Sequence, residues 1–459
     1  MQRPLARLRI VVTIPPYAWF GGVDYNFAIE MSEELRALGA EVFELDLYGF
    51  VYDNEPYIEQ AVAAVKRFGA DVAVSLPNAG YALIARTRDR RNVFTDILRI
   101  PTIMLWDHGL LQFPRIILSP LPDTPEHTRD GCIRRLSQAL DHDLYVHYSP
   151  DRGHIAELDR LGVIGRDRVH FYLQPAYPNY VRHGYRAFNT NAFRSRVAFA
   201  GNVYLQGSRS LSFAGHPVLD EIAKRVAAAK SERLTDCLWD LFLEELEGLD
   251  EHLRAELHLQ PDSSFFWKYM HDQIEVAGNT SVRLHVLSGL KYQFDFFGNF
   301  IEPESASTLR SQYNITVRKS LDYFSELPLL FVNSDVIVDI INLGYNTGIS
   351  PKMTGCMACG GLVLFDYKDD FRNSVGDAAD EVMYTSVDHL NGMVENYLSQ
   401  PRRRADVSRY LQQLACTKFS FRALCIRLFV DEPLWRYPRS RHAPIESQPT
   451  TTSSPSAGL

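Results

Sequence analysis

A repeated alternation of short apolar strands and amphipathic helices is the feature that most constrains how this chain folds. Residues 8–14 (LRIVVTI) form a continuous apolar run, which is typical of a strand buried on both faces. Phe27, Met31 and Leu35 then recur at helical spacing, and Gly39 ends the helix. Strands that alternate with helices are joined by crossover connections, so the pattern predicts a parallel sheet covered on both faces.

The same pattern continues along the chain and then restarts. In the first half, strands are predicted at 41–47, 71–76, 101–106, 143–148 and 168–174, with helices at 56–68 and 152–161. In the second half, strands are predicted at 196–200, 292–297, 335–341 and 361–365, with helices near 350–358, 386–399, 402–415 and 419–430. We therefore predict an α/β fold with two Rossmann-type, doubly wound domains.

The break between the two halves falls near 180–195, where the regular pattern is lost. We predict an N-terminal domain (1–190), a C-terminal domain (191–436) with a helical insertion at 216–290, and a disordered tail (437–459) rich in Pro, Ser and Thr. Ligands of doubly wound domains bind beyond the carboxyl ends of the parallel strands. Two such domains facing each other predict an interdomain cleft, which suits a reaction from which water is excluded.

Composition and charge exclude several broad classes of protein. The 459 residues are 46% hydrophobic, which is the proportion of a folded chain and not of a disordered one. With 48 basic and 56 acidic residues the net charge is −8, so no overall positive field favours nucleic acid as a partner. Six cysteines are too few for a disulfide scaffold and suit a reducing compartment.

The sequence gives no sign of a membrane-spanning segment. It has no uninterrupted apolar run of about 18 residues, the length that a transmembrane helix needs. The N-terminus has a short apolar run that stops at Pro15 and lacks the pattern of a signal peptide. We expect a cytoplasmic protein. The basic runs at 86–91 and 402–404 are typical of solvated faces, and contact with a membrane surface is the alternative.

The most informative stretch is GYNTGISPKMTGCMACGGLVLFD, at 344–366. It resembles the C-terminal signature of the CgeB-type (spore-maturation-protein-like) glycosyltransferases of the GT-B fold, in which a G-x-S-P-R loop leads into a helix and then a strand ending in Asp. Three further segments resemble that family in the same order: IPTIMLWDHG (100–109), VAFAGNVY (197–204) and the E-V-x-x-Y pattern within 379–400. The resemblance spans about 95–415.

This resemblance implies a function and a division of roles. It implies a glycosyltransferase that moves a sugar from a nucleotide-diphosphate donor to an acceptor glycan, protein or small molecule, with no metal and no cofactor besides the donor. The C-terminal domain would hold the nucleotide sugar and the N-terminal domain the acceptor, and the last helices (419–435) would pack back on the first domain. Two positions depart from the family pattern. Gly355 replaces a Glu expected to bind the ribose hydroxyls, and Lys352 replaces an Arg, which loses the bidentate fork.

Backbone N–H groups at a helix N-terminus, together with a cation, stabilise a departing diphosphate. The start of the predicted helix 350–358 offers both, because a capping Ser is followed by Pro at the first helical position and then by Lys. The candidate diphosphate-binding residues here are Asn346, Thr347, Gly348, Ser350 and Lys352. The alternative interpretation is an ordinary capped helix with a surface lysine.

Two glycine-containing turns supply further candidates. Gly21 and Gly22 follow the first strand, and Asn202 follows Gly201 at the end of the first strand of the second half. Since glycine lets the backbone approach a ligand closely, we include Gly21, Gly22 and Asn202 as donor-binding candidates. Plain turns are the alternative. The motif is not G-x-G-x-x-G, so no dinucleotide site is predicted.

A catalytic base is needed if the transfer inverts the anomeric centre, and the sequence leaves the stereochemistry open. Asp107 and His108 follow the predicted strand 101–106 and are candidates to deprotonate the acceptor hydroxyl; a satisfied turn is the alternative. Asp24 is another candidate base, or a first-turn residue favoured by the helix dipole. Asp366 ends a predicted strand and is also expected to face the cleft.

Other common chemistries find no support in the sequence. Cys356 and Cys359 form C-x-x-C inside a predicted helix, without a second pair, which indicates packing and not a zinc site. The H-E-x-x-H, P-loop and G-x-S-x-G motifs are absent from the sequence. Two alternatives to a transferase stay open. One is a catalytically silent binding or scaffold protein, motivated by Gly355, and the other is a different GT-B enzyme such as an epimerase or a phosphorylase.

Overall fold

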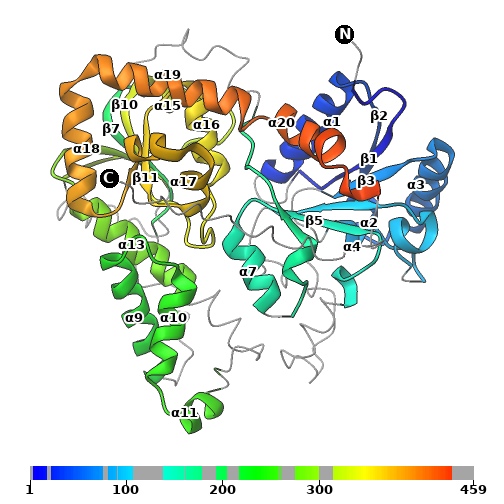
Figure 1. Cartoon of the computed structure of the whole chain (residues 1–459), viewed down its shortest axis with the longest axis horizontal. Helices are drawn as coiled ribbons and strands as arrows, with labels where there is room; N and C mark the ends of the chain where they lie inside the picture. Colours follow the sequence, from blue (N-terminus) through cyan, green and yellow to red (C-terminus); the bar gives the residue numbers. More distant parts are fainter. Residues whose placement is uncertain are drawn as a thin grey trace, which may run out of the picture.

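Figure 1 shows the fold of the chain in a computed structural model. The structure describes residues 4–17, 22–75, 81–89, 91–106, 138–160, 162–177, 193–203, 217–257, 259, 274–298 and 314–436. The predicted disordered tail, 437–459, lies outside the described residues, as does most of the predicted domain break.

The first half of the chain forms a six-stranded parallel sheet in the order β2-β1-β3-β4-β5-β6. Its strands are β1 (Arg9–Ile14), β2 (Glu41–Asp46), β3 (Val72–Ser75), β4 (Thr102–Leu105), β5 (Tyr145–Ser149) and β6 (Val169–Phe171). Every residue of β3, β4 and β5 is buried, as the continuous apolar runs predict for strands covered on both faces. The helices are α1 (Val23–Ala37), α2 (Tyr48–Val51), α3 (Glu55–Phe68), α4 (Tyr81–Ile84), η2 (Val93–Leu98), α7 (Arg152–Arg160) and η4 (Arg166–Arg168).

The second half forms another six-stranded parallel sheet, in the order β12-β11-β10-β7-β8-β9. Its strands are β7 (Ser195–Ala200), β8 (Phe294–Phe297), β9 (Ile315–Arg318), β10 (Ser334–Asp339), β11 (Val363–Asp366) and β12 (Met383–Tyr384). The chain runs outward from β7 to one edge, returns to the centre at β10 and then runs to the other edge. This is the Rossmann strand order, and its topological switch point lies between β7 and β10. The predicted α/β fold with two doubly wound domains of the GT-B kind is confirmed.

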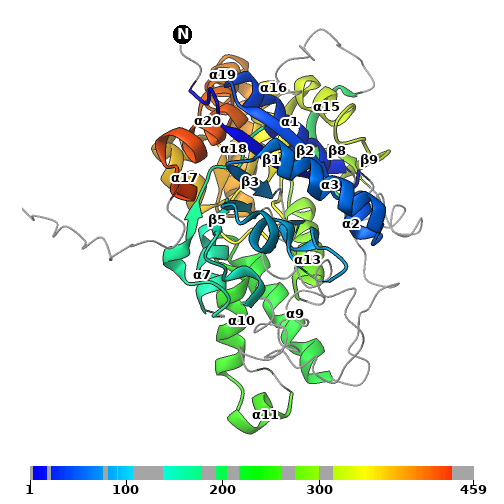
Figure 2. The same ribbon diagram turned by 90° about the vertical axis from the view of Figure 1, so that its right-hand side faces the viewer.

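Helices cover this second sheet and also extend away from it. Those near the sheet are α15 (Leu327–Asn333), α16 (Pro351–Cys359), α17 (Asp369–Val375), η8 (Gly376–Glu381), α18 (Val387–Ser399) and α19 (Pro401–Thr417). The segment predicted as a helical insertion holds α9 (Pro217–Glu232), α10 (Leu238–Glu247), α11 (Glu251–Glu256) and α13 (Val276–Ser288). α9 packs against both α10 and α13. Figures 1 and 2 both show α10 and α11 extending well away from the two sheets.

The chain ends by crossing back to the first half. After α19 it forms α20 (Phe421–Ile426), η9 (Arg427–Asp431) and η10 (Leu434–Arg436). α20 packs on α1, where the ring of Phe421 meets that of Phe27 at a centroid distance of 4.7 Å. Arg422 also pairs with Glu34 at 3.0 Å. The predicted return of the last helices to the first domain is confirmed.

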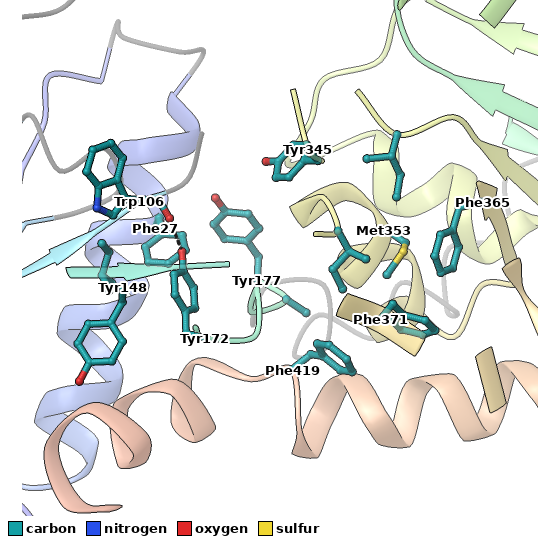
Figure 3. Packing of buried hydrophobic residues seen from close by; sticks show 14 of the residues in the cluster. Phe27, Trp106, Tyr148, Tyr172, Tyr177, Tyr345, Met353, Phe365, Phe371 and Phe419 are labelled. Carbon is teal, nitrogen blue, oxygen red and sulfur yellow. Dashed lines mark hydrogen bonds between the residues drawn. The ribbon is translucent and has the colours of Figure 1, made fainter. Parts of the chain in front are cut away.

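The two hydrophobic cores are continuous where the chain passes between the domains. Figure 3 shows Tyr177 and Phe419 between the aromatic residues of one half and those of the other. Tyr177 packs edge-on against Phe27 on one side and Phe324 on the other, with ring centroids 6.4 and 5.5 Å apart. The backbone N–H of Ala176 donates to the Phe419 carbonyl at 2.8 Å. These contacts hold the carboxyl end of the first sheet next to the loop that precedes α16.

Candidate functional site

Helix α16 begins at the carboxyl edge of the second sheet, and its N-terminus is capped as the sequence predicts. Ser350 has an extended backbone, with φ −83° and ψ 154°, and its hydroxyl accepts from the Met353 N–H at 3.4 Å. Pro351 follows at the first helical position, where its missing N–H costs nothing. Lys352 therefore lies in the first turn of the helix.

Lys352 reaches from that turn to the topological switch point. Its ammonium donates to the carbonyl of Ala200 at 2.8 Å and pairs with Asp339 Oδ1 at 2.5 Å. Ala200 is the last residue of β7, and Asp339 is the last residue of β10. The lysine thus lies across the ends of the two strands between which doubly wound sheets bind their ligands.

The exposures of the two charged partners differ. The Asp339 side chain is 2% exposed, whereas that of Lys352 is 23% exposed. Among the described residues, the carbonyl of Ala200 accepts a hydrogen bond from this ammonium, and Asp339 forms an ion pair with it. The buried carboxylate holds the lysine in place while part of its charge still faces outward. This arrangement suits the binding of an anion.

Asn202 lies at the same edge, just beyond β7. Its carbonyl accepts from Arg283 Nη1 at 2.6 Å, which ties the turn to α13. The neighbouring Gly201 donates its N–H to Phe297 at the end of β8. The structure therefore brings Asn202 and Lys352 to the same end of the sheet, both next to Ala200.

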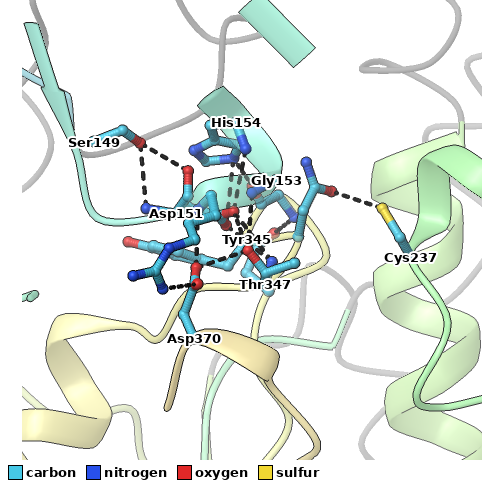
Figure 4. Close-up of polar contacts among 12 residues, drawn as sticks. Ser149, Asp151, Gly153, His154, Cys237, Tyr345, Thr347 and Asp370 are labelled. Atoms are coloured by element: carbon cyan, nitrogen blue, oxygen red, sulfur yellow. Dashed lines mark hydrogen bonds and ion pairs between the residues drawn. The ribbon is translucent and has the colours of Figure 1, made fainter. Parts of the chain in front are cut away.

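The middle of the same loop contacts the first domain instead. Thr347 donates its N–H to both oxygens of the Asp151 carboxylate, at 3.1 and 3.2 Å. Its hydroxyl lies 2.9 Å from Asp151 Oδ1 and 2.7 Å from Asp370 Oδ2, and it accepts from the Gly153 N–H at 2.9 Å. Figure 4 shows Thr347 enclosed by these groups. Gly348 packs so closely that an added Cβ would lie 2.6 Å from the Pro150 carbonyl oxygen.

Helix α7 of the first domain presents its N-terminus to this loop. Asp151 caps the helix through the His154 N–H at 3.2 Å. Asp370, from the second domain, accepts from the Arg152 N–H at 2.9 Å and from its guanidinium at 2.6 Å. A carboxylate at a helix N-terminus is favoured by both the free N–H groups and the helix dipole. The two domains are therefore joined by charge-assisted hydrogen bonds through α7.

Three titratable residues in α7 and directly before it, next to the contact with Thr347, have shifted pKa values: Asp151, His154 and Glu157. Burial raises the pKa of Asp151, but His154 and the hydrogen bonds from Thr347 and Gly348 outweigh it, so the pKa lies below its ordinary value. Burial lowers the pKa of His154, but the nearby carboxylates outweigh it and raise the pKa above its ordinary value. Its Nε2–H donates to the Gly344 carbonyl at 2.6 Å. Burial raises the pKa of Glu157, one turn along α7, to about 7.

The remaining loop candidate, Asn346, contacts Cys237, the residue directly before α10. Its side-chain oxygen accepts from the Cys237 thiol at 3.5 Å. On its other side, an added Cβ at Gly153 would lie 2.4 Å from the Asn346 Cβ. The candidates therefore divide into two groups: Ser350, Lys352 and Asn202 at the sheet edge, and Asn346, Thr347 and Gly348 at the domain contact.

The candidates from the first domain are only partly described. Gly21, Asp107 and His108 lie outside the described residues. Gly22 has the left-handed φ of 78° that favours glycine, and its carbonyl accepts from the Asn26 side chain at 2.7 Å. Asp24 is 1% exposed in the first turn of α1.

Asp366 and the C-x-x-C cysteines serve the fold of the second domain. The Asp366 side chain accepts from the Ile341 N–H at 2.7 Å and lies 3.5 Å from the Lys368 ammonium. Cys356 and Cys359 are buried in α16, as packing residues are expected to be. Within the described ranges, no group of three or more His, Cys, Asp or Glu side chains is arranged to hold a metal ion.

The sequence reasoning missed the acidic partners on both sides. Strand β10 ends at Asp339, two residues before the predicted end of this strand at 341. A carboxylate at the carboxyl end of a buried strand could have indicated that Asp339 belongs to the site. Asp151 precedes the predicted helix 152–161 and reads as a cap. No sequence pattern indicates that Asp151 also contacts Thr347, which lies 196 positions away.

Comparison with known proteins places a family match on the second domain. Residues 281–423 match the family described as glycosyl transferase-like. The match runs from α13 to α20 and includes Lys352 and Asp339. Comparison with curated proteins finds no match.

Several solved structures have a distantly similar fold. A glycosyltransferase from Rickettsia africae ESF-5 shares 12% identity, with 94% of this chain and 98% of that chain covered and a TM-score of 0.46. Sucrose-phosphate synthase from Thermosynechococcus elongatus shares 12% identity, with 94% and 98% covered and a TM-score of 0.48. Anabaena Alr3699/HepE in complex with UDP and glucose shares 11% identity, with 93% and 99% covered and a TM-score of 0.45. At such values the likeness itself carries no argument, and the fold is assigned from the two strand orders.

Proposed function

We propose that the protein is a glycosyltransferase that uses a nucleotide-diphosphate sugar. The observation that carries this proposal is the position of Lys352, whose ammonium spans the ends of β7 and β10 beside the capped N-terminus of α16. A cation beside the positive end of a helix dipole at a topological switch point suits a diphosphate. The glycosyl transferase-like match over 281–423 supports the same function.

In the proposed reaction, the bond between the anomeric carbon and the diphosphate oxygen breaks, and its electron pair stays on the diphosphate. Lys352 and the dipole of α16 stabilise the negative charge that develops there. An acceptor hydroxyl forms the new bond to the anomeric carbon and gives up its proton. Asp107 and His108 remain the proposed candidates for the base that takes it, if the transfer inverts the anomeric centre.

The remaining parts of the proposal concern the partners and the setting. The acceptor is a glycan, a protein or a small molecule, and the reaction uses neither a metal nor a cofactor besides the donor. We also propose a cytoplasmic location with no nucleic-acid partner. No helix among the described residues has the length and apolar character needed to cross a bilayer. The CgeB-type resemblance of 344–366 stays part of this proposal.

The decisive experiment is a calorimetric titration with UDP, GDP and ADP. We expect the wild type to bind at least one of them and Lys352→Ala to lose about 1–3 kcal/mol of binding free energy, the scale of a charged hydrogen bond. The double variant Asp339→Asn/Lys352→Ala keeps the test valid, since it leaves no unpaired buried carboxylate. Lys291→Ala is the control, because Lys291 is exposed and its partner Asp388 is 94% exposed.

A second candidate function is a catalytically silent binding or scaffold protein. Two observations favour it: Gly355 supplies no side chain for a ribose, and Asp151 already engages the N–H groups of Thr347 and Gly348. Failure of the wild type to bind any of the three nucleotides would support this candidate against the transferase.

A further inference from the structure

We infer that Gln174 binds the sugar of the donor, through hydrogen bonds between its side-chain amide and two neighbouring hydroxyl groups of the sugar ring. This inference rests on the proposed function and names a binding residue for its substrate. Gln174 lies in the irregular segment that follows β6 and leads from the first domain toward the second.

The first step of the argument is the state of the Gln174 side chain. The residue is 1% exposed, and neither its amide oxygen nor its amide nitrogen has a hydrogen-bond partner among the described residues. An amide can donate two hydrogen bonds and accept two more. A buried amide that forms none of them destabilises the protein, whereas an apolar side chain of similar size does not. This cost indicates that the amide serves a partner outside the chain.

The second step is the position of Gln174 between the two domains. Two residues before it, the Tyr172 hydroxyl donates to the Trp106 carbonyl at 2.8 Å, just beyond the end of β4 (Figure 3). At the next residue, the Pro175 carbonyl accepts from the Thr354 hydroxyl at 3.3 Å. Thr354 lies in α16, one turn after the cap of that helix. Gln174 therefore lies between the carboxyl edge of the first sheet and the start of the helix that is proposed to face the diphosphate.

The third step is which part of the donor reaches this position. In the proposed reaction, the second domain holds the diphosphate and the first domain holds the acceptor. The sugar is bonded to the diphosphate on one side and meets the acceptor hydroxyl on the other, so it lies between them. Each hydroxyl of a sugar ring both donates and accepts, and an amide matches a neighbouring pair with one N–H and its oxygen. No hydrogen bond to a described residue holds the Gln174 amide, so turning it toward the sugar breaks none.

Gln174→Met tests the inference in the full-length chain, because Met keeps the length of the side chain and removes both polar groups. Both proteins are titrated with UDP, GDP and ADP and with UDP-glucose, UDP-galactose, GDP-mannose and ADP-glucose. We expect the variant to bind the free diphosphates as the wild type does and to bind the sugar nucleotide about tenfold more weakly. Its thermal unfolding midpoint without ligand should rise by about 1–3 °C, since an unpaired buried amide is removed.

Two further variants keep the test decisive. Gln60→Met is the matched control, since Gln60 is exposed on α3 of the same domain, and it should change neither quantity. Gln174→Leu repeats the substitution with an apolar side chain of another shape, so that a packing fault peculiar to Met does not decide the result.

The outcomes separate this inference from the proposed function. A lower unfolding midpoint in both apolar variants overturns the inference, since the amide then has a structural partner such as a buried water. Unchanged affinity for every sugar nucleotide, or equal weakening for the free diphosphate and its sugar ester, overturns the contact with the sugar. Each of these results leaves the transferase standing. A wild type that binds none of these nucleotides overturns the proposed function, and this inference with it.

Discussion

The loop before α16 and the first turn of α16 contain two segments, Asn346–Gly348 and Ser350–Lys352. The polar groups of these two segments have different bonding partners. At Ser350–Lys352, the contacts come from the same domain: the hydroxyl caps its own helix and the ammonium reaches Ala200 and Asp339. At Asn346–Gly348, four positions earlier, the loop also contacts α7 and the turn before it in the other domain. Ser350–Lys352 therefore lies at the edge of one sheet, whereas Asn346–Gly348 forms part of the contact between the domains.

This difference shows that a loop can carry two roles within a few residues. The Lys352 half is built by strand order alone, because β7 and β10 must end side by side at the switch point. The contacts of Thr347 with Asp151 and Gly153 exist only while the two domains are docked. Conditions that weaken docking should therefore change the second half and leave the first intact, and the predictions that follow use this contrast.

The largest expected effect is a pH dependence from Glu157. Its raised pKa of about 7 means that the folded state favours the protonated carboxyl. The resulting stability is present in full below the ordinary pKa of 4.5 and is lost as the pH rises through about 7, a loss on the order of 3 kcal/mol. His154, whose pKa is also raised, acts in the same direction. Thermal unfolding between about pH 5 and pH 8 measures the loss.

Glu157→Gln should flatten this pH profile, because the amide does not titrate. Asp151 does not oppose the trend in this range, since its pKa is lowered and its stabilisation is already complete above its ordinary value of 3.8. Glu275 and Arg160 also act on Glu157 through their charges, and the variant leaves both residues in place. Parallel profiles for the wild type and Glu157→Gln would contradict this assignment.

A smaller effect is expected from Gly348→Ala. The new methyl group would meet the backbone oxygen of Pro150 at 2.6 Å, and backbone cannot yield as a flexible side chain can. We expect a loss of about 1–3 kcal/mol in unfolding free energy, or separation of the domains in its place. Gly392→Ala on α18 is the control, since nothing lies within 4 Å of an added Cβ there. A fully stable, docked Gly348→Ala would show that this contact is looser than described.

The smallest expected effect on stability comes from Ser350, in the segment whose contacts lie within the second domain. Ser350→Ala removes the cap of α16 and should cost about 1 kcal/mol of stability. Because the same change alters the helix N-terminus beside Lys352, nucleoside-diphosphate affinity should fall as well. Ser386→Ala removes the equivalent cap of α18, where the Ser hydroxyl accepts from His389 at 3.1 Å. Equal binding by both variants would separate the α16 N-terminus from the ligand site.

The sequence predicts features that depend on residues close together in the chain better than contacts between residues far apart in the chain. The strands and most helices are encoded by local apolar runs, and β1, β7 and β10 lie where those runs predict. Strand β12 was missed because two residues carry no distinct pattern, and β9 (ITVR) because its side chains are only partly buried, unlike those of the equally short β3, β4 and β11. The start of α16 was predictable from Ser350 and the proline after it, since a cap is a local signal.

The contacts between the two domains have no comparable local pattern in the sequence. Nothing near Asp151 distinguishes it from any other capping residue, and its contact with Thr347 depends on how two separately folded units dock. Lys352 was found as a cation near a helix start, but the sequence suggested a free surface lysine or a phosphate ligand. Its buried partner Asp339 emerged only when the strand order placed β10 beside β7.

The connections between the domains bear on how the molecule can move. The chain passes from one half to the other twice, around Ala176 and again around Ser420, and these two passages are paired side by side as a short parallel bridge. Both passages therefore lie on nearly the same line. A change of backbone angles at these two adjacent passages would rotate one half relative to the other. The strand pairing within each sheet would stay unchanged.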